Sequence, residues 1–292
     1  MNILITGSSG FIGSYLANYL NDKHNIYVIN RHDNISNPGL NNICCDLTLP
    51  FSYDILPNCV DVVIHLAQSR NYRNFPGFSE DIYNVNVHST FRLLEYARKV
   101  GAKKFVLASS GGVYGFGSHT FNEQSPVAPG GFYQCSKTAA ESLAQGYQSF
   151  FTTIILRPFF VYGPLQQGML IPSLIEKVAF KKTITIEGDP GLHINPLYVD
   201  DAVRAIDACI NHDVSEIFNL AGDESISISG LVELISAQLG MQACVEHSPA
   251  LPGQSLLGDN TKMKQILGVF PDVSLHEGIS KMIQANITRK GV

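Results

Sequence analysis

The sequence predicts an α/β protein: a Rossmann-like doubly wound parallel sheet with a smaller mixed α/β lobe at its C-terminal end. Short apolar runs alternate with helical segments through the first half of the chain. A glycine-rich turn joins the first apolar run to the first helical segment, as dinucleotide-binding folds require. After Pro158 the pattern changes, because prolines at 164, 172, 190, 196, 249 and 252 divide the chain into short pieces.

Composition restricts the class of protein. The chain of 292 residues is 45% hydrophobic and only 15% charged, which suits a compact enzyme with a large core. The net charge is −5 and no Lys/Arg run exceeds a pair, so nothing indicates a nucleic-acid or membrane surface. The first strand is predicted from residue 2, which leaves no room for a signal peptide. No apolar run approaches the ~20 residues of a membrane span. We therefore expect a cytoplasmic protein.

The N-terminal half predicts six strands. Apolar runs place them at residues 2–6, 26–29, 42–45, 62–66, 104–109 and 153–156. Helical patterns occur at residues 11–20, 85–100 and 133–150. Right-handed crossovers between parallel strands then place a ligand crevice at the carboxyl ends of the strands.

The turn after the first strand runs from Gly7 to Gly13 and contains Gly10 between them. Gly7 allows a tight turn, Gly10 lets the backbone approach a pyrophosphate, and Gly13 lets the helix pack on the strand. Gly10 is also expected to adopt a backbone conformation that favours glycine. The following helix offers unpaired N–H groups to phosphates. This turn therefore predicts a dinucleotide site.

The remainder is predicted as a substrate lobe. The predicted dinucleotide-binding domain covers residues 1–163, and residues 164–292 are mainly the substrate lobe. Helices are predicted at 197–211, 231–239 and 274–285, and a strand at 216–220. Residues of about 197–220 are expected to pack back on the first domain.

Three residues predict proton-transfer chemistry. Tyr133 and Lys137 are four apart, so they project from one face of a helix. A phenol has a pKa of about 10, and a neighbouring ammonium is expected to lower the pKa of Tyr133. Ser110 ends the fifth predicted strand and is placed to orient a substrate oxygen. The predicted catalytic residues are therefore Ser110, Tyr133 and Lys137.

The tip of the second strand bears on the choice of dinucleotide. An acidic side chain there accepts hydrogen bonds from a ribose 2′-hydroxyl, whereas a guanidinium pairs with a 2′-phosphate. The tip carries Asn30 and Arg31, and Arg31 favours NADP over NAD. In the alternative, Arg31 is a solvated charge and Asp33 reaches the ribose.

The glycine turn and the Ser/Tyr/Lys set together resemble the extended short-chain dehydrogenase/reductase family, of the NAD-dependent epimerase/dehydratase type that modifies nucleotide sugars. The resemblance spans nearly the whole chain through Asp46-Leu47, His65-Leu66-Ala67-Gln68, Asn86-Val87, Leu156-Arg157-Pro158, Val161-Tyr162-Gly163-Pro164, Tyr198-Val199-Asp200-Asp201, Leu267-Gly268 and Val273-Ser274-Leu275. It implies an NAD(P)-dependent oxidoreductase that transfers hydride at a sugar carbon, taken as C4. It also implies a homodimer formed through the helices at 85–100 and 133–150.

The resemblance further implies which residues form each subsite. Tyr133 exchanges a proton with the substrate oxygen, Ser110 hydrogen-bonds that oxygen, and Lys137 holds the nicotinamide ribose. The expected cofactor-binding residues are Gly7, Gly10, Phe11, Ile12, Gly13, Arg31, Asp46, Leu47, Leu66, Ala67, Gln68, Tyr133, Lys137 and Pro158. The expected substrate-binding residues are Ser110, Gly111, Gly112, Phe160 and Pro196. No metal ligands are expected, because the six cysteines form no Cys-x2-Cys pair.

The two residues after Ser110 narrow the reaction. Dehydratases of the family carry an Asp-Glu pair there and its decarboxylases keep a Glu, whereas this chain has Gly111 and Gly112. A 4-epimerase or a 4-ketoreductase remains, and the NADPH preference inferred from Arg31 favours the reductase. Two alternatives stay open: an NADPH-dependent reductase of another small carbonyl compound, and a dinucleotide-sensing binding protein.

Three departures from the family pattern concern the substrate diphosphate, which needs charge-assisted donors. Phe160 replaces the usual Asn, Ile194 replaces an Arg, and no Arg follows Pro252-Gly253. Lys177, Lys262 or backbone amides are the candidate replacements. A nucleotide sugar is nevertheless the expected substrate.

Overall fold

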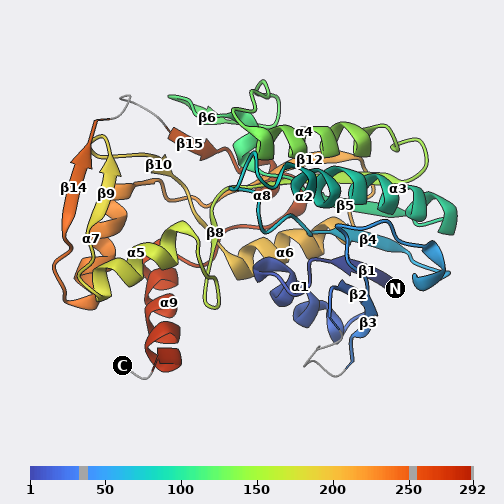
Figure 1. Ribbon diagram of the computed structural model, residues 1–292, viewed down its shortest axis with the longest axis horizontal. Coiled ribbons are helices and arrows are strands. Elements are labelled where there is room, and N and C mark those ends of the chain that lie inside the picture. Colours follow the sequence, from blue (N-terminus) through green and yellow to red (C-terminus); the bar gives the residue numbers. More distant parts are fainter. Residues whose placement is uncertain (33–38, 250–254, 291–292) are drawn as a thin grey trace.

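The computed structural model describes residues 1–32, 39–249 and 255–290. Figure 1 shows a sheet with helices at the right and a smaller mixed lobe at the left. The N-terminus lies beside the sheet, whereas α9 (Leu275–Lys290), the last helix along the chain, belongs to the smaller lobe.

The larger lobe is built on a seven-stranded sheet in the order β12-β7-β5-β4-β1-β2-β3. Its strands are β1 (Asn2–Thr6), β2 (Asn25–Asn30), β3 (Asn41–Cys44), β4 (Val62–His65), β5 (Lys104–Ala108), β7 (Thr152–Pro158) and β12 (Glu216–Leu220). All neighbouring strands in it are parallel. Strands β1 to β3 progress in one direction and β4 to β12 in the other. The order therefore reverses between β1 and β4, where open α/β sheets bind ligands.

Helices cover both faces of this sheet. They are α1 (Phe11–Asn21) and α6 (Val199–Ile210) on one face, and α3 (Ser89–Val100) and α4 (Phe132–Gln145) on the other. Alternate residues of β1 face opposite layers, because Ile3 and Ile5 belong to the core cluster of α1 and α6, whereas Leu4 belongs to that of α3 and α4. A strand buried on both faces needs an unbroken apolar run, which is what the sequence shows here.

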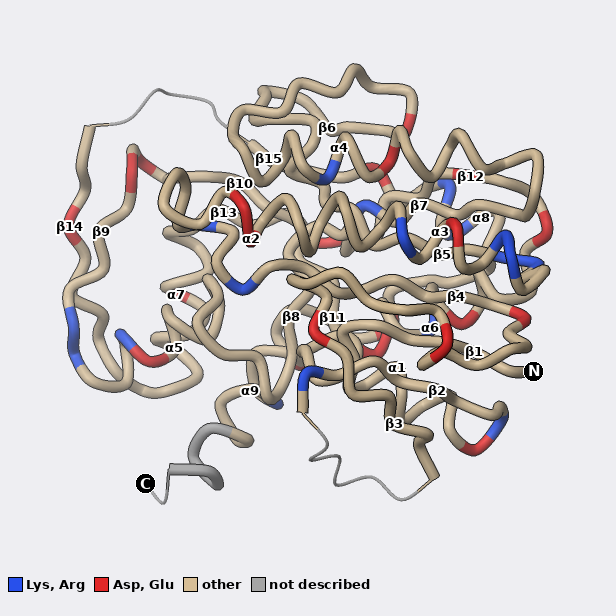
Figure 2. Tube along the Cα trace, turned by 45° about the vertical axis from the view of Figure 1, so that its right-hand side comes forward, with Lys and Arg blue, Asp and Glu red and all other residues tan. Residues whose placement is uncertain are grey.

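The smaller lobe is assembled from short pieces. It contains α5 (Leu170–Ala179), β9 (Ile184–Glu187), β10 (His193–Ile194), β13 (Ile226–Ser227), α7 (Ile228–Leu239), β14 (Val245–Ser248), β15 (Ser255–Gly258) and α9 (Leu275–Lys290). The linking elements are η1 (Tyr53–Ile55), α2 (Ser79–Tyr83), η2 (Asn84–His88), η3 (Gly111–Tyr114), β6 (Thr120–Phe121), β8 (Val161–Tyr162), β11 (Leu197–Tyr198) and α8 (Thr261–Leu267). Lys/Arg and Asp/Glu are interspersed along the described trace (Figure 2).

The predicted fold class and the doubly wound parallel sheet are confirmed. The strand predicted at 216–220 is β12, which joins the sheet beside β7, and α6 packs against α1. The division at residue 163 stays a prediction. The helix predicted to residue 150 ends at Gln145, where Gly146, a poor helix former, follows. The helix predicted from residue 197 begins at Val199, because Leu197 and Tyr198 pair with β8.

A buried ion pair fixes α4 against the sheet. Arg157 of β7 donates to both carboxylate oxygens of Glu141 on α4, over 3.0 and 2.6 Å, and to the Tyr114 hydroxyl over 2.7 Å. The Tyr114 hydroxyl in turn donates to Asn219 of β12 over 2.8 Å. Arg157 is therefore a structural residue that holds α4 in place.

Candidate active site

The glycine turn closes tightly against the end of β4. Gly7 has a φ of +76°, and a Cβ there would lie 2.7 Å from the Ala67 nitrogen. A Cβ on Gly13 would lie 2.2 Å from the Gly7 carbonyl oxygen. These two positions therefore require glycine, because a side chain at either would collide with backbone.

Gly10 differs from the expectation. Its φ is −84° and its ψ 174°, an extended conformation that any residue adopts, so the expected glycine-only backbone is wrong here. Gly10 begins α1 without a side-chain cap, and no acidic residue occupies the first turn. The N–H groups of that turn are thus left for an anion, and the helix dipole favours one. This N-terminus fits the pyrophosphate of a dinucleotide.

A buried network organises the carboxyl ends of β1 and β4. The His65 ring is hydrogen-bonded to Thr6 Oγ1 over 2.6 Å and to Thr90 Oγ1 over 3.0 Å. The Ala67 N–H donates to Thr6 Oγ1 over 3.2 Å. Burial, together with the nearby Lys137 ammonium, lowers the pKa of His65 to about 3. His65 is therefore a neutral structural group that positions Leu66 and Ala67 beside the turn.

The tips of β2 and β3 form the far end of the crevice. Ser8 donates to Asn30 Oδ1 over 2.9 Å, and Asn30 donates to Asn42 over 3.2 Å, so Asn30 is engaged within the protein. Arg31 is exposed beside it. The alternative residue, Asp33, lies outside the described residues.

The three predicted catalytic residues converge at the ends of β5 and α4. The Lys137 ammonium donates to the Ala108 carbonyl at the end of β5 over 2.8 Å and lies 5.9 Å from the centre of the Tyr133 ring. The Tyr133 hydroxyl donates to Gln68 Oε1 over 3.0 Å. Ser110 Oγ accepts from the Gly112 N–H over 3.1 Å and lies close enough to the Tyr133 phenol to act on its pKa.

Burial sets the protonation of this pair. It raises the pKa of Tyr133 above its usual value, although the Ser110 hydroxyl acts in the opposite direction. Burial also lowers the pKa of Lys137 to about 8, opposed by the Glu141 carboxylate. The expectation that Lys137 lowers the pKa of Tyr133 is not met in this geometry, because desolvation of the phenol outweighs the other effects.

The two positions after Ser110 differ in the room that they leave for a side chain. A Cβ on Gly111 would lie 2.7 Å from the ring of Phe159, which is itself fully buried. A Cβ on Gly112 would lie 3.2 Å from Ser110 Oγ and 3.5 Å from Gln134 Cγ. Phe159 therefore fills the space that a side chain at position 111 would need.

A cavity of about 780 Å³ joins these groups, a size typical of ligand sites. The expected site residues that line it are Gly7, Gly10, Phe11, Ile12, Gly13, Arg31, Asp46, Leu47, Leu66, Ala67, Gln68, Ser110, Gly112, Tyr133, Pro158 and Phe160. Lys137 is buried below this surface, and Gly111 is covered by Phe159.

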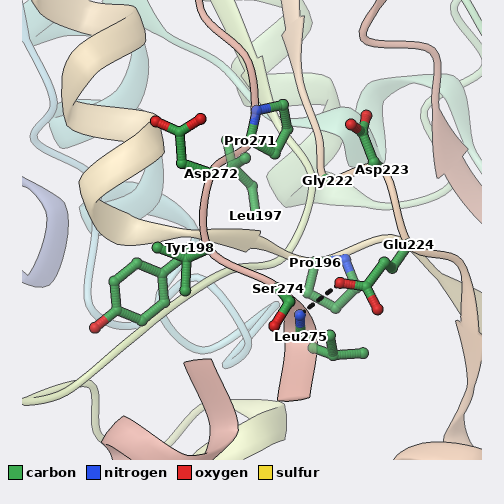
Figure 3. Close-up of a pocket in the computed structure, with 11 residues that line it drawn as sticks. Pro196, Leu197, Tyr198, Gly222, Asp223, Glu224, Pro271, Asp272, Ser274 and Leu275 are labelled. Carbon is green, nitrogen blue, oxygen red and sulfur yellow. Dashed lines mark hydrogen bonds between the residues drawn. The ribbon is translucent and has the colours of Figure 1, made fainter. Parts of the chain in front are cut away.

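Pro196 lies elsewhere. It lines a smaller pocket of about 180 Å³ near the start of α9, shown in Figure 3. In this pocket the Leu275 N–H donates to Glu224 over 2.6 Å, which caps the helix. A Cβ on Gly222 would lie 2.0 Å from the Pro196 carbonyl, so close packing holds Pro196 at this place. The structure does not bring it to the larger cavity.

Several lining residues were not predicted from the sequence. They are Arg70, Tyr72, Arg73, Gln134, Gln166 and Met169. The Tyr72 ring lies 4.8 Å from that of Tyr133. Position alone could have indicated the first three, since a segment that follows β4 starts at the carboxyl edge of the sheet, where ligands bind.

Comparison with known proteins decides the family. A family model described as the NAD dependent epimerase/dehydratase family matches residues 3–221. The chain belongs to this family. The predicted resemblance and the prediction of an enzyme are therefore confirmed.

Members of the epimerase/dehydratase family are similar to the chain over most of its length. YtcB of Bacillus subtilis, named an uncharacterized UDP-glucose epimerase, is 31% identical over 309 residues, or 97% of either chain. A dTDP-D-glucose 4,6-dehydratase of Dictyostelium discoideum is 34% identical over 77% of this chain and 59% of its own length. Among solved structures, a Bacillus cereus UDP-glucuronic acid 4-epimerase with UDP-glucuronic acid and NAD is 27% identical, with a TM-score of 0.89 over 99% of this chain and 100% of that one.

The comparison corrects the choice of cofactor. The family is described as NAD-dependent and the similar epimerase structure contains NAD, so the expected preference for NADP is wrong. An exposed guanidinium does not by itself select a 2′-phosphate, because it is equally solvated when only ribose hydroxyls are nearby. The preference for a reductase rested on Arg31 and is withdrawn with it.

Two features are absent from the described residues. No helix there is long and apolar enough to cross a membrane. No group of three or more His, Cys, Asp or Glu side chains in the same residues is arranged to hold a metal ion.

Proposed function

We propose that the protein is a 4-epimerase of a nucleotide-activated sugar with NAD as its cofactor. The observation that carries the proposal is the arrangement after β5: Ser110 and Tyr133 face one cavity, whereas Gly111 and Gly112 provide no carboxylate. Water elimination needs an added acid and base, and the position of Phe159 excludes a side chain at 111. Epimerisation needs only one proton-exchanging group beside the reacting carbon.

The residues of the chain provide binding and proton transfer. The glycine turn and the α1 N-terminus are placed to hold the pyrophosphate, and the Lys137 ammonium to hold the nicotinamide ribose. When bound, the nicotinamide supplies the redox chemistry at C4. The Tyr133 oxygen takes the proton of the C4 hydroxyl and later returns it, and Ser110 orients the same hydroxyl. For epimerisation, the rest of the cavity has to allow the sugar ring to turn either face of C4 toward the nicotinamide.

The experiment is a panel of UDP-, dTDP- and GDP-sugars incubated with purified protein and NAD. We expect one or more of them to yield its C4 epimer without net consumption of NAD. Consumption of NADH on a 4-keto sugar nucleotide, without epimer formation, would instead make the protein a ketoreductase. Binding of NAD with no turnover on the whole panel would contradict both.

We also propose that the protein forms a homodimer through α3 and α4. The supporting observation is that large apolar side chains on or beside these helices are exposed, with Phe91 41% and Phe150 59% accessible. Exposed large apolar side chains on two neighbouring helices are candidates for an association surface.

A further inference from the structure

The cations that line the active-site cavity are unevenly placed. On the side of the smaller lobe the described lining residues are uncharged, and they include Phe160, Gln166, Gln167, Gly168, Met169 and Leu256. Arg70 and Arg73 line the cavity from residues 68–74, which follow β4 and are named here the β4 segment. The third lining cation in the described part, Arg31, stands at the tip of β2, two strands away from β4.

Arg73 is fixed where the two lobes meet. Its guanidinium donates to the Gly168 carbonyl over 3.1 Å and contacts Met169 Sδ over 3.6 Å. It also lies 5.0 Å from the centre of the Tyr72 ring, and Tyr72 packs on Tyr133. One aromatic ring therefore separates Arg73 from the catalytic phenol. A guanidinium has five N–H donors, so most of its capacity remains for a ligand.

Arg70 is exposed and makes no hydrogen bond or ion pair with another described residue. A carboxylate is close in sequence and lines the same cavity, since Asp81 accepts hydrogen bonds from Ser69 and, over 3.4 Å, from Asn71. Asp81 forms no ion pair with either arginine. Neither arginine of the β4 segment is thus paired with a carboxylate of the described residues, although Asp46 and Asp81 line the same cavity.

We infer that Arg70 and Arg73 bind the diphosphate of the nucleotide-activated sugar. The inference rests on the proposed function and adds to it the residues that recognise the substrate. A doubly charged diphosphate in a partly enclosed cavity needs charge-assisted donors, and the smaller lobe supplies none from the described lining. The position agrees with the chemistry. The diphosphate is attached at C1, across the sugar ring from C4, and so lies one ring away from Tyr133, as Arg73 does.

The test measures binding of UDP and of uridine to the NAD-loaded protein by titration calorimetry. Arg70→Gln and Arg73→Gln should each lower the affinity for UDP about 10- to 100-fold, which is the usual contribution of a charged hydrogen bond. The affinities for uridine and for NAD should not change. Arg70→Lys and Arg73→Lys should recover part of the loss. Arg98→Gln is the matched control, because Arg98 pairs with Glu95 on α3 and does not line the cavity.

The outcomes separate this inference from the proposed function. Parent-like UDP affinity in both Gln variants would overturn the inference alone. So would an equal loss for UDP and uridine, which would mean that Arg73 merely fastens the loop at Gly168. A loss confined to UDP-glucuronate, with UDP and UDP-glucose unaffected, would assign the arginines to a sugar carboxylate and overturn the diphosphate assignment. A parent protein that binds none of UDP, dTDP and GDP would overturn the proposed function together with the inference.

Discussion

At the scale of single residues, burial decides which groups carry protons at neutral pH. It raises the pKa of Tyr133 and lowers that of Lys137 to about 8, so the phenol is neutral and the ammonium is still largely charged. His65, with a pKa of about 3, is neutral as well. Removal of a proton from the substrate hydroxyl requires the phenolate, so oxidation at C4 should accelerate as the pH rises above neutrality.

Replacing Tyr133 by Phe removes only the hydroxyl. We expect the fold to survive and turnover to fall by roughly 10²–10⁴, the usual worth of acid–base catalysis. The measurement is kcat on the substrate found in the panel. Tyr83→Phe is the control, because Tyr83 is exposed and does not line the cavity. A Tyr133→Phe enzyme with near-parent kcat would show that another group moves the proton.

His65 should make stability depend on acid pH. Its pKa is about 3 when folded against about 6.5 when unfolded, so the unfolded chain takes up the proton first. Above pH 6.5 His65 is neutral in both states and does not affect the free energy of unfolding. As the pH falls from 6.5 toward 3, this free energy decreases by up to about 1.4 kcal/mol per pH unit. Urea unfolding measures the free energy of unfolding at pH 7.5 and at pH 5.5. The decrease between the two pH values should be smaller in His65→Gln than in the parent. Equal differences would contradict a neutral buried His65.

At the scale of elements, the start of α1 depends on two glycines for different reasons. Gly13 allows the helix to touch the turn, whereas Gly10 leaves room in front of the helix N-terminus. Gly13 is therefore required for packing within the protein, whereas Gly10 is required for binding of the ligand. Substitutions can separate them.

Gly13→Ala places a Cβ 2.2 Å from the Gly7 carbonyl oxygen. Because backbone has to move, we expect a loss of about 1–3 kcal/mol in unfolding free energy and weaker NAD binding. The Cβ of Gly10→Ala would lie 3.0 Å from the same oxygen. This variant should lose less than about 1 kcal/mol of unfolding free energy, yet it should still bind NAD more weakly than the parent. Denaturant unfolding and NAD titration of both variants measure this. Parent-like NAD affinity in Gly10→Ala would contradict a phosphate at this turn.

At the scale of the whole molecule, the topology explains why distant residues share one cavity. The order reversal between β1 and β4 brings the glycine turn beside Ala67, while β5 and α4 add Ser110 and Tyr133. The smaller lobe closes the cavity through the loop around Gly168. The complete cavity therefore takes its walls from both lobes.

The dimer can be tested at this scale. Phe91→Glu combined with Phe150→Glu should convert a dimer into a monomer, because charges on an apolar interface cost more than the contact supplies. Sedimentation equilibrium measures the mass, and circular dichroism checks the fold. Phe180→Glu, at an equally exposed Phe at the end of α5, is the control and should remain dimeric. A parent that is already monomeric would contradict the proposal.

The sheet could be predicted because its strands carry local signals. The apolar runs and the glycine turn depend on neighbours in sequence, and even β12 was located at 216–220. The substrate side of the cavity is harder to predict from the sequence, because its contacts join segments that are distant along the chain. No local pattern indicates that Arg73 reaches Gly168, or that Gly222 holds Pro196 in another pocket. The preference drawn from Arg31 failed because one exposed charge has no unique partner.

The anchor of α4 bears on when the enzyme becomes active during its synthesis. Arg157 contacts Glu141 and, through Tyr114, Asn219. The helix that carries Tyr133 and Lys137 is anchored to β7, and that anchor is hydrogen-bonded to a strand made much later. A nascent chain that has emerged only as far as α4 already contains every proposed catalytic side chain. We expect such a chain to remain inactive at least until Asn219 and then the smaller lobe have left the ribosome, so that the enzyme becomes competent only near the end of its translation.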